Sequence, residues 1–388
     1  MPALSRVLCL DDFEPLSRRH LPRPVFGYVA GATERNASLR ENQDAFTEWG
    51  FVPRVLTDVS KRSQAVTLFG REWSTPFGIA PMGMSALVAW RGDLALTRAA
   101  RAADIPMIMS GSSLIRMEEI IAENPDAWFQ AYLPGDSRRV EALVDRVAAA
   151  GFGTLLLTVD TAVLPNRENN VRNGFSTPLR PSLRLAWDGA IRPRWLLNTW
   201  TRTLMRHGMP HFENSFAERG APILARNVLR DFTARDHLNW EHLALIRRRW
   251  KGRLIVKGVM HPEDARRSEG EGADGVIVSN HGGRQLDGTA SPLRVLPEVV
   301  KAAPGITVML DGGVRRGTDI LKAVGLGAKF VFVGRPMLHA AGVFGEAGVA
   351  HAIALLKGEV DRDMALLGVN SLDEVTPECL VRVRPPVQ

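Results

Sequence analysis

Residues 275–287 read Gly-Val-Ile-Val-Ser-Asn-His-Gly-Gly-Arg-Gln-Leu-Asp, a short apolar run followed at once by a glycine-rich polar stretch. The apolar part is typical of a buried β-strand. His281 and Arg284 follow it in backbone that glycine allows to turn sharply. An imidazole can take a proton near neutral pH, and a guanidinium can hold a carboxylate through two parallel hydrogen bonds. The stretch predicts an enzyme that removes a proton from a carboxylate-bearing substrate. A plain turn with a solvated arginine and a helix-capping histidine is the alternative.

Seven further β-type runs share this character, and helical stretches lie between most of the eight. The other runs are Phe77–Pro81, Pro106–Ser110, Trp128–Tyr132, Thr154–Asp160, Arg253–Gly258, Ile306–Asp311 and Lys329–Gly334. The helical stretches are Asp93–Asp104, Asp136–Ala150, Trp240–Trp250, Pro262–Glu269, Pro292–Ala303 and Thr318–Gly325. Alternating strands and helices predict a parallel sheet, and eight units predict a closed (β/α)8 TIM barrel. No GxGxxG follows the first strand, which disfavours a Rossmann fold.

The chain is long enough to be read as a single domain, 1–388, organised around this barrel. Residues 1–75 form a predicted N-terminal helical extension, 76–345 the barrel, and 346–388 closing helices (349–356 and 361–367) and a tail. About ninety residues separate Asp160 from Arg253, where one connection should lie. So long a segment after the fourth strand predicts an insert or lid, placed at 170–238.

Composition excludes several classes of protein. Two distant cysteines, Cys9 and Cys379, disfavour a disulfide framework or a thiolate metal site. The nine histidines lack metal-ligand spacing, so no metal is expected. No unbroken apolar run reaches the length of a membrane span, and the N-terminus is a poor signal peptide. These features predict a cytoplasmic protein.

The loops after the last two predicted strands have the composition of a phosphate site. Asp311–Gly317 and Gly334–Pro336 combine glycines with Arg315 and Arg335. Glycine-rich backbone and helix N-termini direct N–H groups at an anion, and these two loops bind phosphate in many barrels of this type. Two ordinary turns with solvated arginines are the alternative.

Three charged residues at other strand ends also suggest chemistry. Lys257 follows an apolar run, so it should point into a pocket or pair with an acid, and it could form a Schiff base or hold an anion. Asp160 and Asp311 are acids at strand ends, and either could orient His281 and stabilise its protonated form. Tyr28, taken alone, would be interpreted as a core aromatic residue.

Taken together, these motifs resemble the FMN-dependent 2-hydroxy-acid oxidising family, which includes glycolate oxidase, lactate oxidase, L-lactate dehydrogenase and mandelate dehydrogenase. The matching stretches run in order through nearly the whole chain, and the run Ser279–Asp287 is the most specific. The others are Tyr28–Gly31, Ile79–Pro81, Gln130–Tyr132, Leu157–Asp160, Val256–Gly258, Asp311–Gly317 and Gly334–Pro336.

The resemblance implies oxidation of an L-2-hydroxy acid to a 2-oxo acid, with two electrons passing to FMN. It implies that His281 is the base and Asp160 its charge partner. Arg284 and Arg167 would clamp the substrate carboxylate, aided by the hydroxyl groups of Tyr28 and Tyr132. Lys257 would lie beside the flavin N1 and C2 atoms, where negative charge develops. The other implied FMN contacts are Pro81, Met82 and Gly83 at the N5 edge, Ser110, Gln130, Thr158 and Ser279 around the ring, and Asp311, Gly313, Arg315, Gly334 and Arg335 at the ribityl phosphate.

Three positions bear on specificity within that family. Met82 stands where many relatives have threonine. Gly83 stands where several oxygen-using oxidases have alanine, which favours quinone or the respiratory chain over oxygen as electron acceptor. Small residues at Ser112 and Ser113 leave room for an aryl or larger aliphatic substrate, similar to mandelate or lactate. An oxygen-using oxidase that produces hydrogen peroxide is the alternative.

The insert carries most of the net charge of +7, with seven arginines and one acid between residues 170 and 210. Trp187, Trp195 and Trp200 lie among these arginines, and 192–206 could form a helix with Trp195, Leu196, Thr199, Leu204 and Met205 partly on one face. Basic and aromatic residues together suit an anionic membrane surface, so 175–210 predicts peripheral attachment to the inner face of the membrane. A solvated or intersubunit loop is the alternative. The charge is too local for nucleic-acid binding.

Other classes remain open at this point. A different phosphate-binding barrel enzyme, such as an isomerase, would not need the paired arginines Arg167 and Arg284. A non-catalytic flavin-binding or membrane-scaffold protein would not need His281, Asp160 and Lys257. The resemblance further implies a homotetramer.

Overall fold

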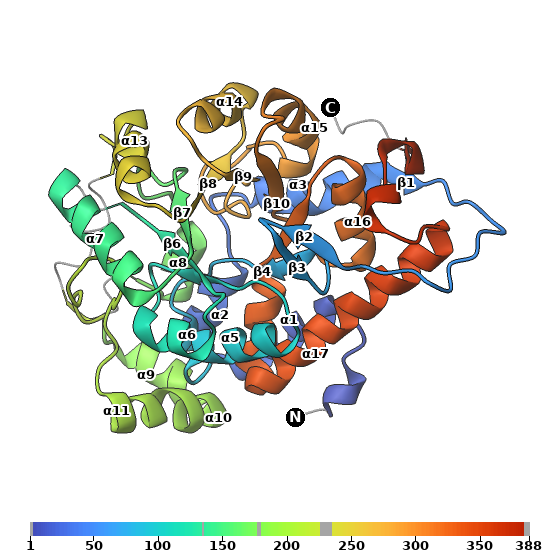
Figure 1. The fold of residues 1–388 in the computed structure, drawn as a ribbon. Coiled ribbons are helices and arrows are strands. Elements are labelled where there is room, and N and C mark those ends of the chain that lie inside the picture. The colour runs from blue at the N-terminus through green and yellow to red at the C-terminus, as the bar shows by residue number, and fades with distance from the viewer. Residues whose placement is uncertain (1–2, 134–135, 177–179, 226–234, 384–388) are drawn as a thin grey trace.

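The computed structural model describes residues 3–133, 136–176, 180–225 and 235–383. Its centre is an eight-stranded parallel sheet in the order β4-β11-β10-β9-β8-β7-β6-β5 (Figure 1). A parallel bridge between Ile79 and Met107 joins the two end strands, so the sheet closes into the predicted (β/α)8 barrel. The strands are β4 (Phe77–Ile79), β5 (Ile108–Ser110), β6 (Trp128–Ala131), β7 (Thr154–Thr158), β8 (Arg253–Val259), β9 (Gly275–Val278), β10 (Thr307–Asp311) and β11 (Phe330–Val333).

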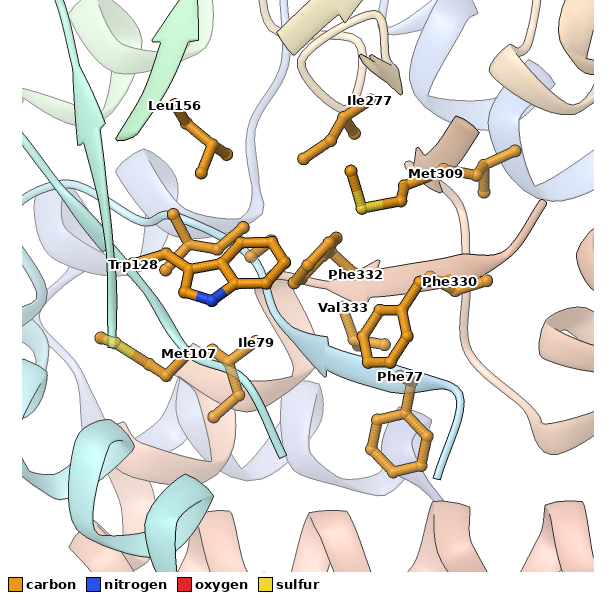
Figure 2. Close-up of a cluster of buried hydrophobic side chains, with 14 of the residues drawn as sticks. Phe77, Ile79, Met107, Trp128, Leu156, Ile277, Met309, Phe330, Phe332 and Val333 are labelled. Carbon is orange, nitrogen blue, oxygen red and sulfur yellow. The ribbon is translucent and has the colours of Figure 1, made fainter. Parts of the chain in front are cut away.

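Large apolar side chains fill the barrel interior. Trp128, Leu156, Ile277, Met309 and Phe332 come from five strands and point toward one another (Figure 2). All are at most 4% exposed, and the rings of Trp128 and Phe332 lie 5.5 Å apart. Successive strand residues alternate between the two faces of a sheet.

That alternation positions the site, because the residue two places further along each strand faces the same interior. Gln130 follows Trp128, Thr158 follows Leu156, and Asp311 follows Met309. The register pairs Thr158 with Lys257 on the neighbouring strand. A layer of polar residues therefore lies above the apolar layer, at the C-terminal ends of the strands where such barrels bind substrates.

Helices surround the barrel, and the six predicted between strands agree within two residues at each end. They are α5 (Gly92–Ala102), α7 (Ser137–Ala150), α13 (Trp240–Arg249), α14 (Pro262–Gly270), α15 (Pro292–Ala302) and α16 (Gly317–Gly325). Helix α7 illustrates why these helix boundaries could be predicted from the sequence. The Asp136 side chain accepts a hydrogen bond from the Arg139 N–H at its start, and Gly151 ends it with φ +99°. Two short helices, α4 (Ser85–Val88) and α6 (Met117–Glu123), were not predicted.

Helix α17 (Arg335–Leu367) consists of two helical parts that meet at a kink, and its second part contains both of the separate closing helices predicted at 349–356 and 361–367. It bends at Gly345, whose φ is +61°. Within the described residues it is the one helix long and apolar enough to cross a membrane, but 56% of its most apolar part is buried. It packs on α1 and α5 as a core helix of the barrel.

The N-terminal region contributes three helices, α1 (Phe13–His20), α2 (Arg23–Ala30) and α3 (Ala37–Asp44). A short strand β1 (Trp49–Phe51) pairs antiparallel with β12 (Leu380–Arg382), so the two ends of the chain meet. The hairpin β2 (Val66–Leu68) and β3 (Arg71–Trp73) precedes the barrel. Short 3₁₀ helices are Leu4–Arg6, Leu10–Asp12, Ala45–Glu48, Leu372–Glu374 and Pro377–Cys379.

The predicted insert follows β7 and contains α8 (Glu168–Asn173), α9 (Leu183–Ala190), α10 (Pro193–Trp195) and α11 (Arg202–His207), with a π-helical segment, Leu196–Thr201, between the last two. Helices α9, α10 and α11 lie together at the lower left of Figure 1. The residues expected to lie partly on one face are divided between buried and exposed positions. Trp195 is 7% exposed and donates to the Leu87 carbonyl, whereas Met205 is 81% exposed. The wider π turns rotate the second half of the helix away from the first.

Candidate functional site

A cavity of about 540 Å³ opens at the C-terminal ends of the barrel strands. Most of the predicted site residues line it: Tyr28, Pro81, Met82, Gly83, Tyr132, Thr158, Arg167, Lys257, His281, Arg284, Asp311, Gly313, Arg315, Gly334 and Arg335. Ser110, Gln130, Asp160 and Ser279 do not line this cavity, but each hydrogen-bonds within the same cluster. Ser110 donates to Gln130 at 3.1 Å, and the others contact residues described below.

His281 lies just past β9 in the left-handed backbone region, with φ +58°. The Ser279 hydroxyl oxygen accepts a hydrogen bond from the His281 N–H at 3.0 Å and holds this turn. The imidazole Nδ1 lies 2.9 Å from Asp160 Oδ1, and Nε2 lies 3.5 Å from the Tyr132 hydroxyl. Of the two acids considered for orienting His281, Asp160 is therefore the one in contact.

The electrostatics of this pair favour an ionised Asp160 beside a neutral His281. Burial lowers the pKa of His281, and the opposing effect of Asp160 does not compensate for it. Burial would raise the pKa of Asp160, but the His281 and Lys257 interactions outweigh burial and lower it. An ionised carboxylate can only accept, so Nδ1 carries the imidazole proton and Nε2 is free to accept one on the cavity side.

Lys257 forms a second buried pair, with Asp311. Its Nζ lies 3.0 Å from Asp311 Oδ2 and donates to Ser279 Oγ at 2.9 Å. Burial alone would lower the pKa of Lys257, but the charges of Asp311 and Asp160 raise it, so the amine is a fixed cation. A protonated amine cannot form a Schiff base, which leaves electrostatic stabilisation as its function. Asp311 contacts Lys257 and is not a partner of His281.

Four of the five arginines that line the cavity donate to neutral oxygens, and one of these four, Arg315, also lies near an acid. Arg284 Nη1 donates to the carbonyls of Tyr28 and Gly31 at 2.8 and 2.7 Å. Arg167 donates to the Arg284 carbonyl and the Gln285 side chain. Arg335 donates to the carbonyls of Val29, Gly31 and Gly282. Arg315 lies 3.5 Å from Asp11.

The arginines of this cavity favour the binding of anionic ligands. Desolvation and the neighbouring guanidinium of Arg284 lower the pKa of Arg167 to about 10. The same causes, with Arg315 added, lower the pKa of Arg335 well below the usual arginine range. Buried charge is costly unless it is paired. The site is therefore built for ligands that carry negative charge at two places, near Arg167 and Arg284 and near Arg315 and Arg335.

The residues present fit the FMN that the sequence resemblance implies. Gln130 Nε2 and Thr158 Oγ1 are buried without a hydrogen-bond partner among the described residues, as expected for groups that contact a polar ring. The Gly312-Gly313 pair has φ of +106° and +84°, and α16 begins just beyond it. Glycine-rich backbone before a helix N-terminus, with Arg315 and Arg335 alongside, suits a phosphate.

Sequence reasoning missed several lining residues. Phe175 stacks on Tyr28 at 4.7 Å, and Phe212 belongs to the same buried cluster. The Arg235 guanidinium lies 4.6 Å from the centre of the Tyr132 ring. All three come from the 170–238 segment, whose length indicated a lid but whose contacts depend on how it folds back.

A buried acid, Asp93, lies beneath two loops of the site. It is 1% exposed and lies near the Ser113 and Ser85 side chains, which neighbour Ser112 and Met84 on the cavity wall, and its Oδ2 has no hydrogen-bond partner among the described residues. Burial raises the pKa of Asp93 to about 7, against the lowering effect of the two nearby serines. The folded protein therefore favours the protonated acid. The resulting stabilisation is fully present below an unfolded-state pKa of about 4 and is lost as pH rises through about 7.

We expect Asp93→Asn to gain stability relative to the wild type as pH increases. The free energy of unfolding of the variant, relative to that of the wild type, should increase by roughly 3 kcal/mol between pH 5 and 8. Each pH unit between the two pKa values of Asp93 lowers the wild-type free energy of unfolding by about 1.4 kcal/mol. Urea unfolding of the holoenzyme at both pH values measures it. Asp373→Asn, at a carboxylate whose side chain is 87% exposed, is the matched control. An Asp93→Asn difference that does not change with pH would contradict the assignment.

Comparison with known proteins agrees with this geometry. A sequence model of the family described as FMN-dependent dehydrogenase matches residues 17–382. The chain is 38% identical over 372 residues to (S)-mandelate dehydrogenase of Pseudomonas putida, covering 96% of this chain and 93% of that one. It is 35% identical to L-lactate oxidase of Lysinibacillus sphaericus (strain C3-41), covering 97% of this chain and 93% of that one.

Among solved structures, that of the monotopic membrane protein (S)-mandelate dehydrogenase superposes with a TM-score of 0.89 at 37% identity, covering 97% of this chain and 100% of that one. These relatives match the chain almost from end to end. The match includes the barrel strands, the polar residues at their C-terminal ends and the arginines of the cavity. The protein therefore belongs to the FMN-dependent 2-hydroxy-acid dehydrogenase and oxidase family and is an FMN-dependent oxidoreductase.

Proposed function

We propose that this enzyme oxidises an L-2-hydroxy acid with an aryl or larger aliphatic side chain to the 2-oxo acid. One observation carries the proposal. The His281 imidazole, oriented by Asp160 at 2.9 Å, shares one cavity with Arg167 and Arg284, whose hydrogen bonds within the described residues go to neutral oxygens. A base and two guanidiniums in one pocket are what proton removal from a bound carboxylate requires.

The residues of the cavity have distinct functions in this reaction. Arg284 and Arg167 bind the substrate carboxylate, and the hydroxyls of Tyr28 and Tyr132 help to orient it. His281 Nε2 takes a proton from the substrate, and the Asp160 carboxylate stabilises the imidazolium that forms. The substrate is thereby held in one orientation before the proton moves, which removes much of the entropic part of the barrier.

FMN, when bound, supplies the two-electron acceptor. Arg315, Arg335 and the glycine loops at Gly313 and Gly334 would hold its phosphate. Lys257 would stabilise negative charge on the ring, with Asp311 and Ser279 fixing the amine in place. The remaining ring contacts would come from Pro81, Met82, Gly83, Ser110, Gln130 and Thr158.

The preference for a larger substrate rests on the cavity wall. Phe175 and Phe212 are 5% and 3% exposed, and Phe175 stacks on Tyr28. Ser112, a small residue, lines the same space. An aromatic substrate side chain would pack well against such a wall.

Anaerobic reduction of the yellow holoenzyme tests the proposal. We expect L-mandelate to bleach the flavin absorbance faster than L-lactate does, and the D-enantiomers to be inert. If no 2-hydroxy acid bleached the flavin of the holoenzyme, the proposed activity would be wrong. Faster bleaching by L-lactate would leave the activity standing and reject the larger substrate.

For the electron acceptor we propose a quinone in preference to oxygen. The support is Gly83, which stands where several oxygen-using oxidases of the family have alanine. Gly83 lines the cavity, and an alanine Cβ placed there would lie 3.0 Å from Ser112 Cβ and 3.3 Å from the Tyr28 hydroxyl. The alternative is an oxidase that forms hydrogen peroxide, as the name of the lactate oxidase relative indicates for that protein. Stopped-flow reoxidation of the reduced enzyme should be fast with a soluble quinone and slow with oxygen, and the reverse order would favour the oxidase.

We further propose that the insert holds the enzyme on an anionic membrane from the cytoplasmic side. Leu183, Trp187, Leu197 and Met205 are 93%, 67%, 62% and 81% exposed, and they lie among Arg184, Arg194, Arg202 and Arg206. Exposed apolar side chains beside arginines suit the interfacial zone of a bilayer. The monotopic character printed for the mandelate dehydrogenase structure supports this reading.

The double variant Leu183→Ser/Met205→Ser should bind vesicles containing phosphatidylglycerol more weakly than the wild type, because about 0.8 kcal/mol is lost per methylene no longer buried. Co-sedimentation measures the bound fraction. Val55→Ser/Leu366→Ser removes two exposed apolar residues outside the insert, 82% and 70% against 93% and 81%, and should bind like the wild type. Equal binding by both double variants would exclude the insert as the attachment surface.

A further inference from the structure

A second cavity, of about 470 Å³, is formed by the N-terminal helices and the insert. Its polar lining consists of Arg18, Arg23, Arg192, Asn36, Asn169 and Asn173. Within the part of the chain that the structure describes, the lining contains three arginines and no carboxylate. The residues come from α1, α2, α8, the start of α3 and the start of α10, so the cavity forms only in the folded chain.

The three arginines have no acidic partner among the described residues. Arg23 Nε donates to Asn173 Oδ1 at 2.9 Å, and Arg192 Nε donates to the Leu21 carbonyl at 3.2 Å. Arg18 lies over the Phe26 ring, 5.8 Å from its centre. Nearby, burial and the charges of Arg194 and Arg192 lower the pKa of His20. The charged side chains of the described residues that line this cavity are therefore all positive, with Arg18 and Arg23 exposed and Arg192 half-buried.

We propose that this cavity is a phosphate-group site, separate from the FMN site, which binds a phosphate monoester, a lipid phosphodiester or free phosphate between Arg18, Arg23 and Arg192. Guanidiniums donate several N–H groups in a fixed plane, which suits the tetrahedral oxygens of a phosphate. The Asn36 amide nitrogen lies at the wall and can donate as well, whereas the Asn169 and Asn173 amide groups already donate to the carbonyls of Gly27 and Asn169. A phosphate held here would connect the insert, through Arg192, to α1 and α2.

The helices that line this second cavity also hold residues of the substrate cavity. Helix α8 packs on α2, where Asn169 donates to the Gly27 carbonyl at 2.8 Å, and a Cβ at Gly27 would collide with Asn173 at 2.6 Å. Arg167 is the residue immediately before α8, and the Tyr28 and Gly31 carbonyls of the α2 region hold Arg284. A phosphate between α1, α2 and the insert therefore stabilises the wall from which both carboxylate-binding arginines are held.

Thermal unfolding of the FMN-saturated enzyme, with and without inorganic phosphate, tests the site. Phosphate should raise the Tm of the wild type, because a ligand of the folded state stabilises it in proportion to its affinity. In Arg18→Gln/Arg23→Gln the apparent affinity should fall about tenfold or more. Arg19→Gln/Arg138→Gln removes the same charge from positions that are exposed, as Arg18 and Arg23 are, but that lie outside the cavity, and it should behave like the wild type.

Phosphate that binds in the main cavity would raise the Tm of all three proteins equally, so their difference isolates the second site. The single variant Arg18→Gln, which keeps the Arg23–Asn173 bond, should also lose affinity and guards against a folding defect. An absent Tm shift in the wild type, or equal shifts in the cavity variant and its control, would overturn the proposal. These outcomes leave flavin bleaching by hydroxy acids unaffected, so they test this site independently of the catalytic proposal.

Vesicle co-sedimentation then identifies the source of the phosphate group. If Arg18→Gln/Arg23→Gln also loses binding to phosphatidylglycerol vesicles while Arg19→Gln/Arg138→Gln does not, the ligand is a lipid headgroup. If vesicle binding is unchanged and the Tm response to inorganic phosphate is lost, the ligand is a soluble phosphate. Both results support the site and differ only in what occupies it.

Discussion

Replacing His281 with glutamine is expected to slow anaerobic flavin reduction by the substrate about 10²- to 10⁴-fold, the usual contribution of a positioned general base. Glutamine preserves much of the side-chain volume and can still contact Asp160, but it cannot take a proton. FMN should stay bound, because the charges that would hold its phosphate, Arg315 and Arg335, are untouched. Single-turnover reduction of the yellow variant measures the effect, and turnover at the wild-type rate would reject His281 as the base.

The pH dependence of the same step separates the base from its partner. Because burial lowers the pKa of His281, wild-type kcat/KM should fall on the acid side with a midpoint below 6.5 and stay level above it. Asp160 opposes that lowering, so Asp160→Asn should move the acid limb to still lower pH and reduce the plateau. An acid limb that moves to higher pH in Asp160→Asn would contradict the arrangement described here.

The second large effect is expected at the arginines proposed to clamp the carboxylate. Each of Arg284→Met and Arg167→Met should raise KM roughly 10- to 150-fold, because a hydrogen bond to a charged group contributes about 1.5–3 kcal/mol. Arg284→Lys should recover only part of the loss, since an ammonium cannot form the two parallel bonds of a guanidinium. Steady-state kinetics with L-mandelate and a quinone measures both variants.

Arg172→Met is the matched control for these two substitutions. Arg172 lies on α8 near Arg167, but its side chain is 70% exposed and pairs with Glu168. Its KM should remain at the wild-type value. If Arg172→Met raised KM as much as Arg167→Met does, a general loss of positive potential would explain the effect better than a specific clamp.

Much of the fold could be predicted because its signals are local. Each β-type run and each helix boundary, such as Asp136 before α7 and Gly151 after it, reflects interactions within a few residues. The predicted helices 349–356 and 361–367 were too short, because Gly358 interrupts the local helical pattern between them, whereas α17 continues through Gly358 and is broken at Gly345. Tertiary packing overrides local preference there.

The site was predicted less completely, for a similar reason. The motif around His281 identified the strand end, and the family resemblance implied Asp160 as its partner, but strand-end position alone left Asp160 and Asp311 as equal candidates. Asp160 is 121 residues from His281 in sequence, and Asp311 is held by Lys257 instead. Phe175 and Phe212 could not be placed in the cavity from the insert sequence alone, and the π-helical segment at Leu196–Thr201 changed which side chains are exposed.

By itself, the sequence determined the barrel, the strand ends that carry the polar residues and the family of the enzyme, because strand periodicity and short motifs are properties of neighbouring residues. Only the tertiary structure decided which charges pair, which insert residues reach the substrate cavity, and that Arg18, Arg23 and Arg192 meet around a second one. Electrostatic pairing depends on distances of a few ångströms between side chains that are far apart in the chain, and the folded backbone sets those distances.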